Sequence, residues 1–120
     1  DTKMSLRIED HPTPLKELKR LIRIHRAYQH ANKGDYYMEL NQIDNALTEY
    51  NKASKYYPEN PELPYWSAVA LVNGGRINEA LPIFKAVFKS NPNLKKMTPR
   101  LIKSGLLIDD EKVLKKIMMQ

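Results

Sequence analysis

IDNALTEYNKASKYYP, at residues 43–58, returns in altered form as INEALPIFKAVFKSNP at residues 77–92, 34 residues further along the chain. A period of this length indicates a repeated structural unit. The equivalent pairs are Ile43 and Ile77, Ala46 and Ala80, Leu47 and Leu81, Tyr50 and Phe84, Ala53 and Val87, and Pro58 and Pro92. The sequence therefore predicts two copies of one unit, with the same residues packed inside each copy.

Each copy has apolar residues at positions i, i+3, i+4, i+7 and i+10, which lie on one face of a helix. The small residue at i+3 allows a neighbouring helix to approach closely, and the aromatic residue four positions later fills the space beyond that contact. The final proline cannot continue a helix, so it ends the unit. We therefore expect a helix from Asn41 to about residue 56 and another at about residues 77–89.

Length and composition limit the fold and the chemistry. A chain of 120 residues is one small domain. Cysteine is absent, which excludes disulfides, zinc–thiolate sites and thiol catalysis. Four glycines and no alternating strand pattern favour an all-α fold. No apolar run reaches the roughly 18 residues that a membrane span needs, so we expect no membrane insertion.

The charge is basic, with 20 Lys and Arg against 14 Asp and Glu and a formal net charge of +6. This excess favours an anionic partner without identifying it. The basic residues are dispersed over the first helix and the tail rather than gathered with aromatics along one groove, so we expect no nucleic-acid partner. The chain begins at Asp1 without a methionine, and we expect it to be a domain of a longer protein.

The first part of the chain predicts a long helix. Residues 1–13 are expected to be an extended entry, with Thr13 as N-cap and Pro14 at the first helical position. From residue 15 to residue 40 only Gly34 interrupts the helical pattern, so we expect one long helix or two nearly collinear ones that bend there. Its second half would also be the first helix of the first repeat.

Short polar residues mark the starts of the next helices. Asn41 with Asp44 resembles a capping box that begins the second helix. Asn60 is expected to cap the third helix and Pro61 to open it. The Asn73-Gly74-Gly75 segment predicts a tight turn before the fourth helix.

After residue 94 the period weakens, and a different segment is expected to cover the end of the repeats. Thr98-Pro99 predicts the start of a short helix, and Asp109 or Asp110 the cap of a last one. The expected organisation is therefore one domain at residues 14–120. It contains repeats at about 27–60 and 61–94 and a cap at 95–120.

The repeat resembles the tetratricopeptide repeat, a 34-residue helix-turn-helix unit. The residues that carry this resemblance are Gly34, Tyr37, Ala46, Tyr50, Ala53 and Pro58, and then Ala68, Leu71, Gly75, Ala80, Phe84, Val87 and Pro92. Trp66 departs from the family pattern because the usual aromatic lies two residues earlier, and Asn41 departs because glycine is common there. The resemblance implies TPR-like helical repeats and a non-catalytic binding module.

A narrower resemblance covers nearly the whole chain. LRIEDHPTPLKELKRLIRIHRAY at residues 6–28, the repeats, and GLLIDDEKVLKKI at residues 105–117 are together similar to a bacterial C-terminal domain. In that family it follows an Ntn-hydrolase-like domain and is assigned to peptidoglycan binding. The resemblance implies an accessory domain in a secreted or periplasmic protein, with any hydrolase nucleophile upstream of Asp1. Without it, a cytoplasmic location is expected.

We expect no catalytic residue, metal or cofactor in this chain. His25 and His30 are five residues apart and do not share a helix face as metal ligands would. His11 lies beside Asp10 and Pro12, where a role in the turn is the simpler account. The serines have no nucleophile-elbow pattern around them.

The tetratricopeptide resemblance implies a concave groove lined by the first helix of each pair. Carried onto this chain, the groove residues are Tyr28, Asn32, Asp35, Glu39, Tyr65, Trp66, Val69, Asn73, Lys96 and Arg100. The alternative for Tyr65, Trp66 and Val69 is that they only pack against the first helix and the tail. The subclass of these repeats that grips a C-terminal carboxylate is disfavoured, because Ala31, Asp35 and Trp66 stand where its Lys and Asn residues are needed.

The expected partner is a peptide, a protein or a cell-wall fragment held in this groove. Two repeats make a shallow groove, which leaves a second hypothesis open. In that hypothesis the domain docks on its own upstream enzyme domain or associates with itself as a homodimer.

Overall fold

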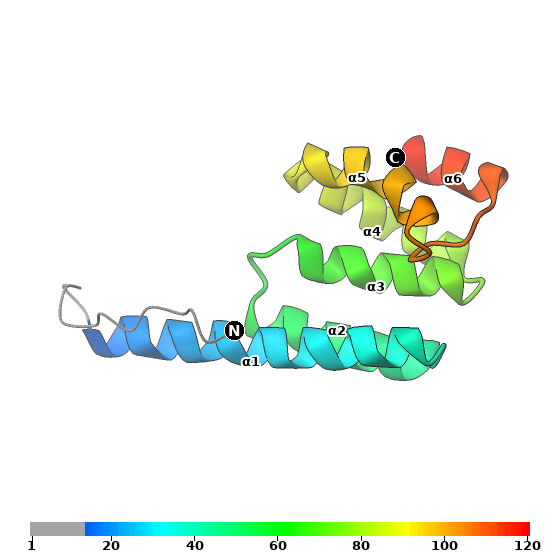
Figure 1. Ribbon diagram of the computed structural model, residues 1–120. Coiled ribbons are helices and arrows are strands. Elements are labelled where there is room, and N and C mark those ends of the chain that lie inside the picture. The colour runs from blue at the N-terminus through cyan, green and yellow to red at the C-terminus, as the bar shows by residue number, and fades with distance from the viewer. Residues whose placement is uncertain (1–13) are drawn as a thin grey trace.

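The computed structural model describes residues 14–120, which form six helices (Figure 1). They are α1 (Pro14–Glu39), α2 (Ile43–Tyr56), α3 (Glu62–Asn73), α4 (Ile77–Ser90), α5 (Pro92–Lys103) and α6 (Glu111–Met118). The predicted all-α, TPR-like fold is confirmed. The expectations for residues 1–13, including the Thr13 cap and the role of His11, lie outside the described residues.

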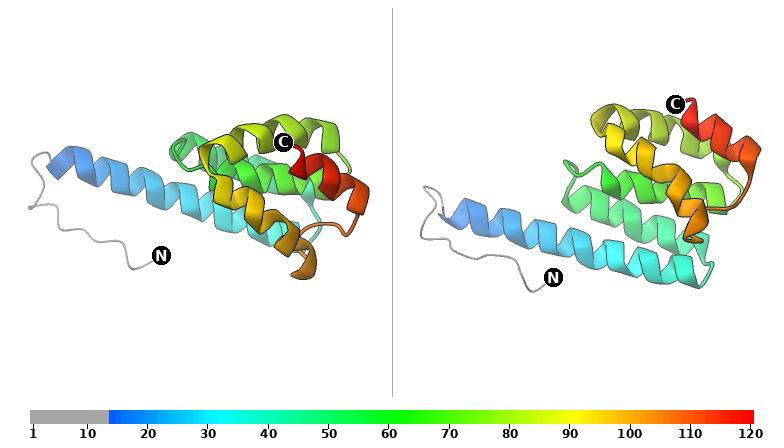
Figure 2. Two further views of the ribbon diagram at one scale, coloured as in Figure 1. Left: turned by 90° about the horizontal axis from the view of Figure 1, so that it is seen from above. Right: turned by 45° about the horizontal axis from the view of Figure 1, so that its top comes forward.

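Consecutive helices stack on one another along the chain. α1 packs on α2, α2 on α3 and α3 on α4, while α5 and α6 both pack on α4 (Figures 1 and 2). The molecule measures 52 × 29 × 23 Å, because α1 is a single helix of 26 residues along its long edge. Across residues 14–120, no helix combines the length and the apolar character needed to traverse a bilayer.

The two copies of the repeat bury the same positions. Ala46 and Ala80 are both fully buried, and Tyr50 and Phe84 are at most 1% exposed. The helix pair α1–α2 is thus equivalent to the pair α3–α4, as the 34-residue period predicts. Gly34 lies beneath Tyr50, and a Cβ atom at Gly34 would fall 2.5 Å from the tyrosine ring.

α3 is the central helix, because eight of its twelve residues are buried and it is enclosed on both sides. Its residues Tyr65, Ala68 and Val72 join a core with Phe84 and Phe88 of α4. Its Ala70 faces the other way and packs with α2. A helix that is apolar all round is expected to be buried in this manner.

The prediction that Asn41 begins the second helix is wrong. Asn41 has a φ of 57° and follows the end of α1, while α2 begins at Ile43 and its N-cap, Gln42, makes no side-chain cap bond. Gly75, at the equivalent position of the second copy, has a φ of 79°. Asparagine is among the few residues that tolerate this left-handed conformation, so it replaces the glycine that is common there.

The other predicted caps are in part confirmed. The Asn60 side chain accepts a hydrogen bond from the Glu62 backbone N–H at 3.0 Å, although Pro61 precedes α3 instead of opening it. The Asp110 carboxylate accepts hydrogen bonds from the N–H groups of Lys112 and Val113 at the start of α6.

The predicted helix start at Thr98-Pro99 is also wrong, because α5 is continuous from Pro92 to Lys103. Asn91 caps it by accepting from the Asn93 N–H at 3.2 Å. Thr98 is fully buried inside the helix; its hydroxyl donates to the Leu94 carbonyl at 2.8 Å and bonds with the Tyr65 hydroxyl at 2.9 Å. Thr98 is therefore a contact between α5 and α3 and not a cap.

One ionisable pair joins α1 to α2. His30 Nδ1 lies 2.7 Å from the carboxylate oxygen of Glu49, and Lys52 lies 3.6 Å from the other oxygen. The hydrogen bond with His30 is the main reason that the pKa of Glu49 lies below its usual value, and the charge of Lys52 adds to it. A lowered carboxyl pKa stabilises the fold above the unfolded pKa, and this stabilisation disappears as the pH falls through the lowered pKa.

We expect Glu49→Gln to reduce stability at neutral pH and to have much less effect in acid. The reason is that the parent protein loses the contribution of the ionised carboxylate below the usual carboxyl range, whereas the variant never has it. Urea unfolding at about pH 7 and about pH 3 measures this difference. The exposed Glu59, which lies outside the helices, offers a control: Glu59→Gln should change stability by less than about 0.5 kcal/mol at either pH value.

Candidate functional site

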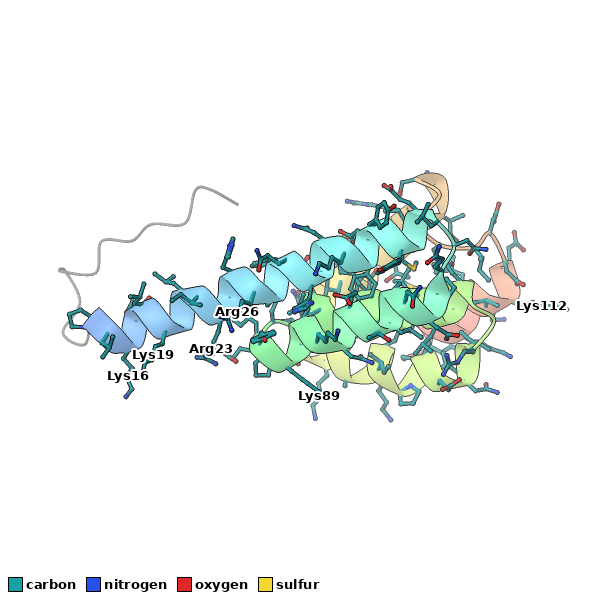
Figure 3. All side chains as sticks on the ribbon, turned by 90° about the horizontal axis from the view of Figure 1, so that it is seen from below. Lys16, Lys19, Arg23, Arg26, Lys89 and Lys112 are labelled. Atoms are coloured by element: carbon teal, nitrogen blue, oxygen red, sulfur yellow. The ribbon has the colours of Figure 1, made fainter. Side chains whose placement is uncertain are left out.

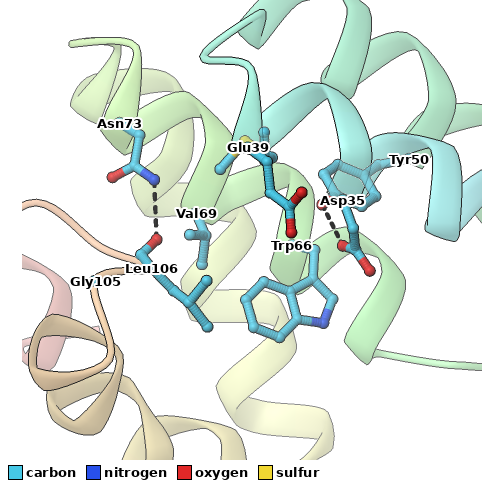
Figure 4. A pocket seen from close by; sticks show the side chains of 9 residues that line it. Asp35, Glu39, Tyr50, Trp66, Val69, Asn73, Gly105 and Leu106 are labelled. Carbon is cyan, nitrogen blue, oxygen red and sulfur yellow. Dashed lines mark hydrogen bonds between the residues drawn. The ribbon is translucent and has the colours of Figure 1, made fainter.

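A cavity of about 500 Å³ opens between the second half of α1, α3 and the segment that joins α5 to α6 (Figure 4). We call it the α1–α3 pocket. Its lining residues are Asp35, Met38, Glu39, Tyr50, Trp66, Val69, Asn73, Gly105 and Leu106. Its volume lies within the range of about 300–1,000 Å³ that is usual for ligand sites.

One wall of the pocket is acidic. Asp35 and Glu39 are four residues apart on α1, and residues at this spacing are neighbours on a helix surface. Neither carboxylate has an ion-pair partner within residues 14–120. Both residues are exposed. The wall therefore carries two negative charges that are available to a ligand.

Tyr50 fixes one of these carboxylates. Its hydroxyl donates a hydrogen bond to Asp35 Oδ1 at 2.7 Å (Figure 4). Burial raises the pKa of Tyr50, and the bond to Asp35 raises it further, so the hydroxyl stays protonated and remains a donor. The aromatic residue of the first repeat copy thus packs the helices together and also orients Asp35.

The floor of the pocket is apolar. The half-buried indole of Trp66 packs edge-to-face on Tyr65, with ring centroids 5.3 Å apart, and Val69 lies beside it. Leu106, which is 49% exposed, contributes the opposite side. Figure 4 shows the indole lying between the Asp35 side and Leu106.

Asn73 holds the wall that Leu106 provides. Its side-chain amide donates to the Leu106 carbonyl at 3.0 Å and its oxygen accepts from the Ile108 N–H at 3.0 Å. Gly105 has a φ of 77°, a conformation that favours glycine and turns the chain toward α3. The position of this wall thus depends on an asparagine whose two polar ends are already occupied.

The structure brings together five of the ten residues that sequence analysis assigned to the groove. Asp35, Glu39, Trp66, Val69 and Asn73 line the α1–α3 pocket, although Asn73 positions the wall and Val69 is fully buried in its floor.

The other five lie elsewhere. Tyr28 lies on α1, and its hydroxyl accepts a hydrogen bond at 3.3 Å from Asn60 in the joint after α2. Asn32 lines a separate surface depression beside α2. Lys96 and Arg100 are exposed on α5 and do not line the pocket. The assignment of Tyr65 to the groove is wrong, because it is fully buried and bonds to Thr98.

Four lining residues were not among the sequence-based assignments: Met38, Tyr50, Gly105 and Leu106. The sequence could have indicated Tyr50, because it is the aromatic residue of the repeat. It could also have indicated Met38, because Met38 is three residues from Asp35 on the same helix. No sequence feature indicates Gly105 and Leu106. They reach the pocket through the contact of Leu106 with Asn73, which is more than thirty residues away in the chain. Within the described part of the chain, no group of three or more His, Asp or Glu side chains is arranged to hold a metal ion.

Comparison with known proteins agrees with the repeated helix pairs. The family described as TPR repeat matches residues 34–75, from the glycine beneath Tyr50 to the positive-φ glycine after α3. No curated protein and no solved structure gives a significant match to the chain. TPR repeats mediate protein–protein interaction. Residues 34–75 therefore resemble a TPR repeat, and they lie within an all-α, TPR-like fold.

Proposed function

We propose that this chain is a non-catalytic binding module that holds a peptide segment of a partner protein in the α1–α3 pocket. We further propose that the segment presents a basic side chain to the acidic wall. The observation that carries this proposal is that two carboxylates, Asp35 and Glu39, which have no ion-pair partner among residues 14–120, line the same pocket as the half-buried indole of Trp66. The match to a family of protein-interaction repeats supports a peptide as the ligand.

The chemistry of these groups fits arginine or lysine. A guanidinium or ammonium group is attracted to the face of an indole and gains about 0.5–2 kcal/mol depending on its desolvation. Hydrogen bonds between such a cation and a carboxylate are roughly twice as strong as neutral ones. The aliphatic part of the side chain would contact Leu106, which is exposed on the opposite side of the pocket. This is the opposite charge preference to a site that grips a C-terminal carboxylate.

We expect a capped hexapeptide with one central arginine to bind at least about tenfold more tightly than the same peptide with citrulline, because citrulline keeps the shape and lacks the charge. Trp66 is the only tryptophan of the chain, so its fluorescence reports binding directly. The double variant Asp35→Asn/Glu39→Gln should lose the preference for arginine. The control Glu59→Gln/Glu111→Gln removes two exposed acids elsewhere and should keep it. Equal binding of the two peptides to the parent protein would refute the proposal.

A cell-wall fragment is the second candidate, and the accessible indole favours it because sugar rings stack on tryptophan. Retention of the chain on purified peptidoglycan, lost in Trp66→Ala, would support this candidate. Retention that Trp66→Ala leaves unchanged would place wall binding outside the pocket. An arginine-dependent fluorescence change without retention would leave the peptide proposal alone. In either case we propose that the domain is an accessory part of a larger bacterial protein.

A further inference from the structure

The first half of α1 projects beyond the rest of the molecule. α1 has 26 residues and α2 has 14, so at 1.5 Å per residue α1 is about 18 Å longer. Ala27 is the first residue of α1 that is buried. The helix before it extends past the other five helices in every view (Figures 1 and 2). We call residues 14–26 the α1 overhang.

The overhang has two chemically distinct faces. Successive residues of a helix are turned by about 100° around its axis. On this basis the cations of the overhang occupy an arc of about 120° around the axis, and its leucines and Ile22 occupy another arc of about 120°. The centres of the two arcs are about 140° apart. The cations are Lys16, Lys19, Arg20, Arg23 and Arg26, and four of them are labelled in Figure 3. The apolar residues on the other face are Leu15, Leu18, Leu21 and Ile22. Both arcs belong to the first half of α1, so the overhang is basic and amphipathic.

The apolar face is partly accessible and lies outside the core. Leu15 is 66% exposed and Ile22 is 44% exposed, while Leu18 and Leu21 are half-buried. None of the leucines of the overhang, nor Ile22, packs against a buried cluster of the described residues. Exposed apolar residues in a contiguous stripe usually mark an interaction surface.

The charge of the overhang is almost entirely positive. Its only acidic residue is Glu17, which pairs with Arg20 at 3.2 Å. Arg26 lies 6.0 Å from the ring centroid of Tyr56, and this contact leaves its charge in place. Five cations thus face one carboxylate, and the complementary surface must be anionic.

We propose that the α1 overhang docks the domain onto an anionic lipid bilayer. Helices that lie in a bilayer interface have this construction, with Lys and Arg on one face and a large apolar residue set on the other. The Leu15–Ile22 stripe would enter the headgroup region, and the cations would meet the lipid phosphates. The helix lies on the surface and does not span the membrane. This inference is independent of the α1–α3 pocket.

A second copy of the chain fits the overhang less well. Leu15, Leu18, Ile22 and His25 follow heptad spacing, but apolar residues occupy it for less than two heptads, whereas coiled coils need three or four. Lys19 and Arg26 flank the stripe, so paired copies would bring like charges together. A bilayer needs only a short stripe and a positive charge.

The test is co-sedimentation of the full 120-residue chain with vesicles of phosphatidylcholine alone and with about one-third phosphatidylglycerol. We expect binding only to the anionic vesicles, and we expect it to weaken as salt rises. Each cation near such a surface contributes about a fivefold factor, so Lys19→Glu/Arg23→Glu should weaken binding about 25-fold or more. The matched control Lys89→Glu/Lys112→Glu makes the same charge change on α4 and α6 and should stay within about twofold (Figure 3).

A second variant separates insertion from simple charge attraction. Leu15→Ser/Ile22→Ser keeps every charge and should reduce binding at about 0.15 M salt, where surface electrostatics are screened. Equal binding of the parent protein to both kinds of vesicle would overturn the proposal, and this readout needs no variant. Equal loss in the two charge variants would overturn it too. Retention on polyglutamate but not on anionic vesicles would replace the bilayer with an acidic protein partner.

Discussion

Phe84→Ala is expected to lower the free energy of unfolding by about 3–5 kcal/mol, the usual cost of removing a buried phenylalanine ring. Phe84 is fully buried. Its ring meets Tyr65 of α3 edge-on, with centroids 5.8 Å apart, and Phe88 of α4 at 5.4 Å. The cavity left by alanine would lie between the central helix and α4, where the surrounding rings are too constrained to close it.

Urea unfolding followed by circular dichroism measures this change, with the midpoint and slope compared between variant and parent. Tyr36→Ala is the matched control, because it also truncates an aromatic residue on a helix but at a side chain that is 59% exposed. We expect the control to change stability by less than about 0.5 kcal/mol. A loss below about 1 kcal/mol for Phe84→Ala would mean that α3 and α4 collapse into the space, and that the surrounding rings are not constrained.

The repeat packing could be predicted from sequence because its contacts are short-range and periodic. Each unit pairs a helix with the next one along the chain, so the same spacing of small and aromatic residues specifies the same contact twice. Tyr50 and Phe84 were identified in this way, and both are buried where expected. The prediction for Asn41 is wrong because asparagine favours two different positions, the N-cap of a helix and a residue of positive φ. In the turn between α1 and α2 it has the positive φ.

The pocket could be predicted only in part. Tyr65 and Trp66 are adjacent on α3, and a difference of about 100° around the helix sends one ring into the core and leaves the other in the pocket. No periodic signal distinguishes them, since α3 is apolar on nearly every side. The position of the pocket wall at Leu106 depends on the hydrogen bond that Asn73 donates to Leu106. This is a long-range contact, and no pattern in the sequence predicts it. Its residues became visible only in the folded chain.

Tyr50 contributes both to the stability of the fold and to the candidate site. The ring fills the first repeat unit, and the hydroxyl orients Asp35 in the acidic wall. A change that displaces this ring should therefore affect both the fold and the proposed preference for a basic side chain. The ring packs against α1 at Gly34, which is also where the family match begins.

Gly34→Leu is expected to destabilise the protein by about 3 kcal/mol, at the upper end of the usual cost of overpacking. Even a Cβ at this position would lie 2.5, 2.7 and 2.8 Å from three carbons of the Tyr50 ring. The ring is 1% exposed, and it could turn toward the α1–α3 pocket only by breaking the hydrogen bond of its hydroxyl to Asp35. Otherwise the helices α1 and α2 would have to separate.

Gly34→Ala decides between two opposing effects at the same site. Alanine in a helix is favoured over glycine by about 1 kcal/mol, and the contact with Tyr50 acts against it. We expect the contact to dominate and the variant to unfold at lower urea than the parent. In the background of Tyr50→Leu, which shortens the opposing side chain, the same substitution should become neutral or stabilising, and the difference is the coupling energy of the pair. If Gly34→Ala raised the midpoint in the parent background, the tyrosine ring would have to move freely, and the close packing of α1 on α2 would not explain the glycine.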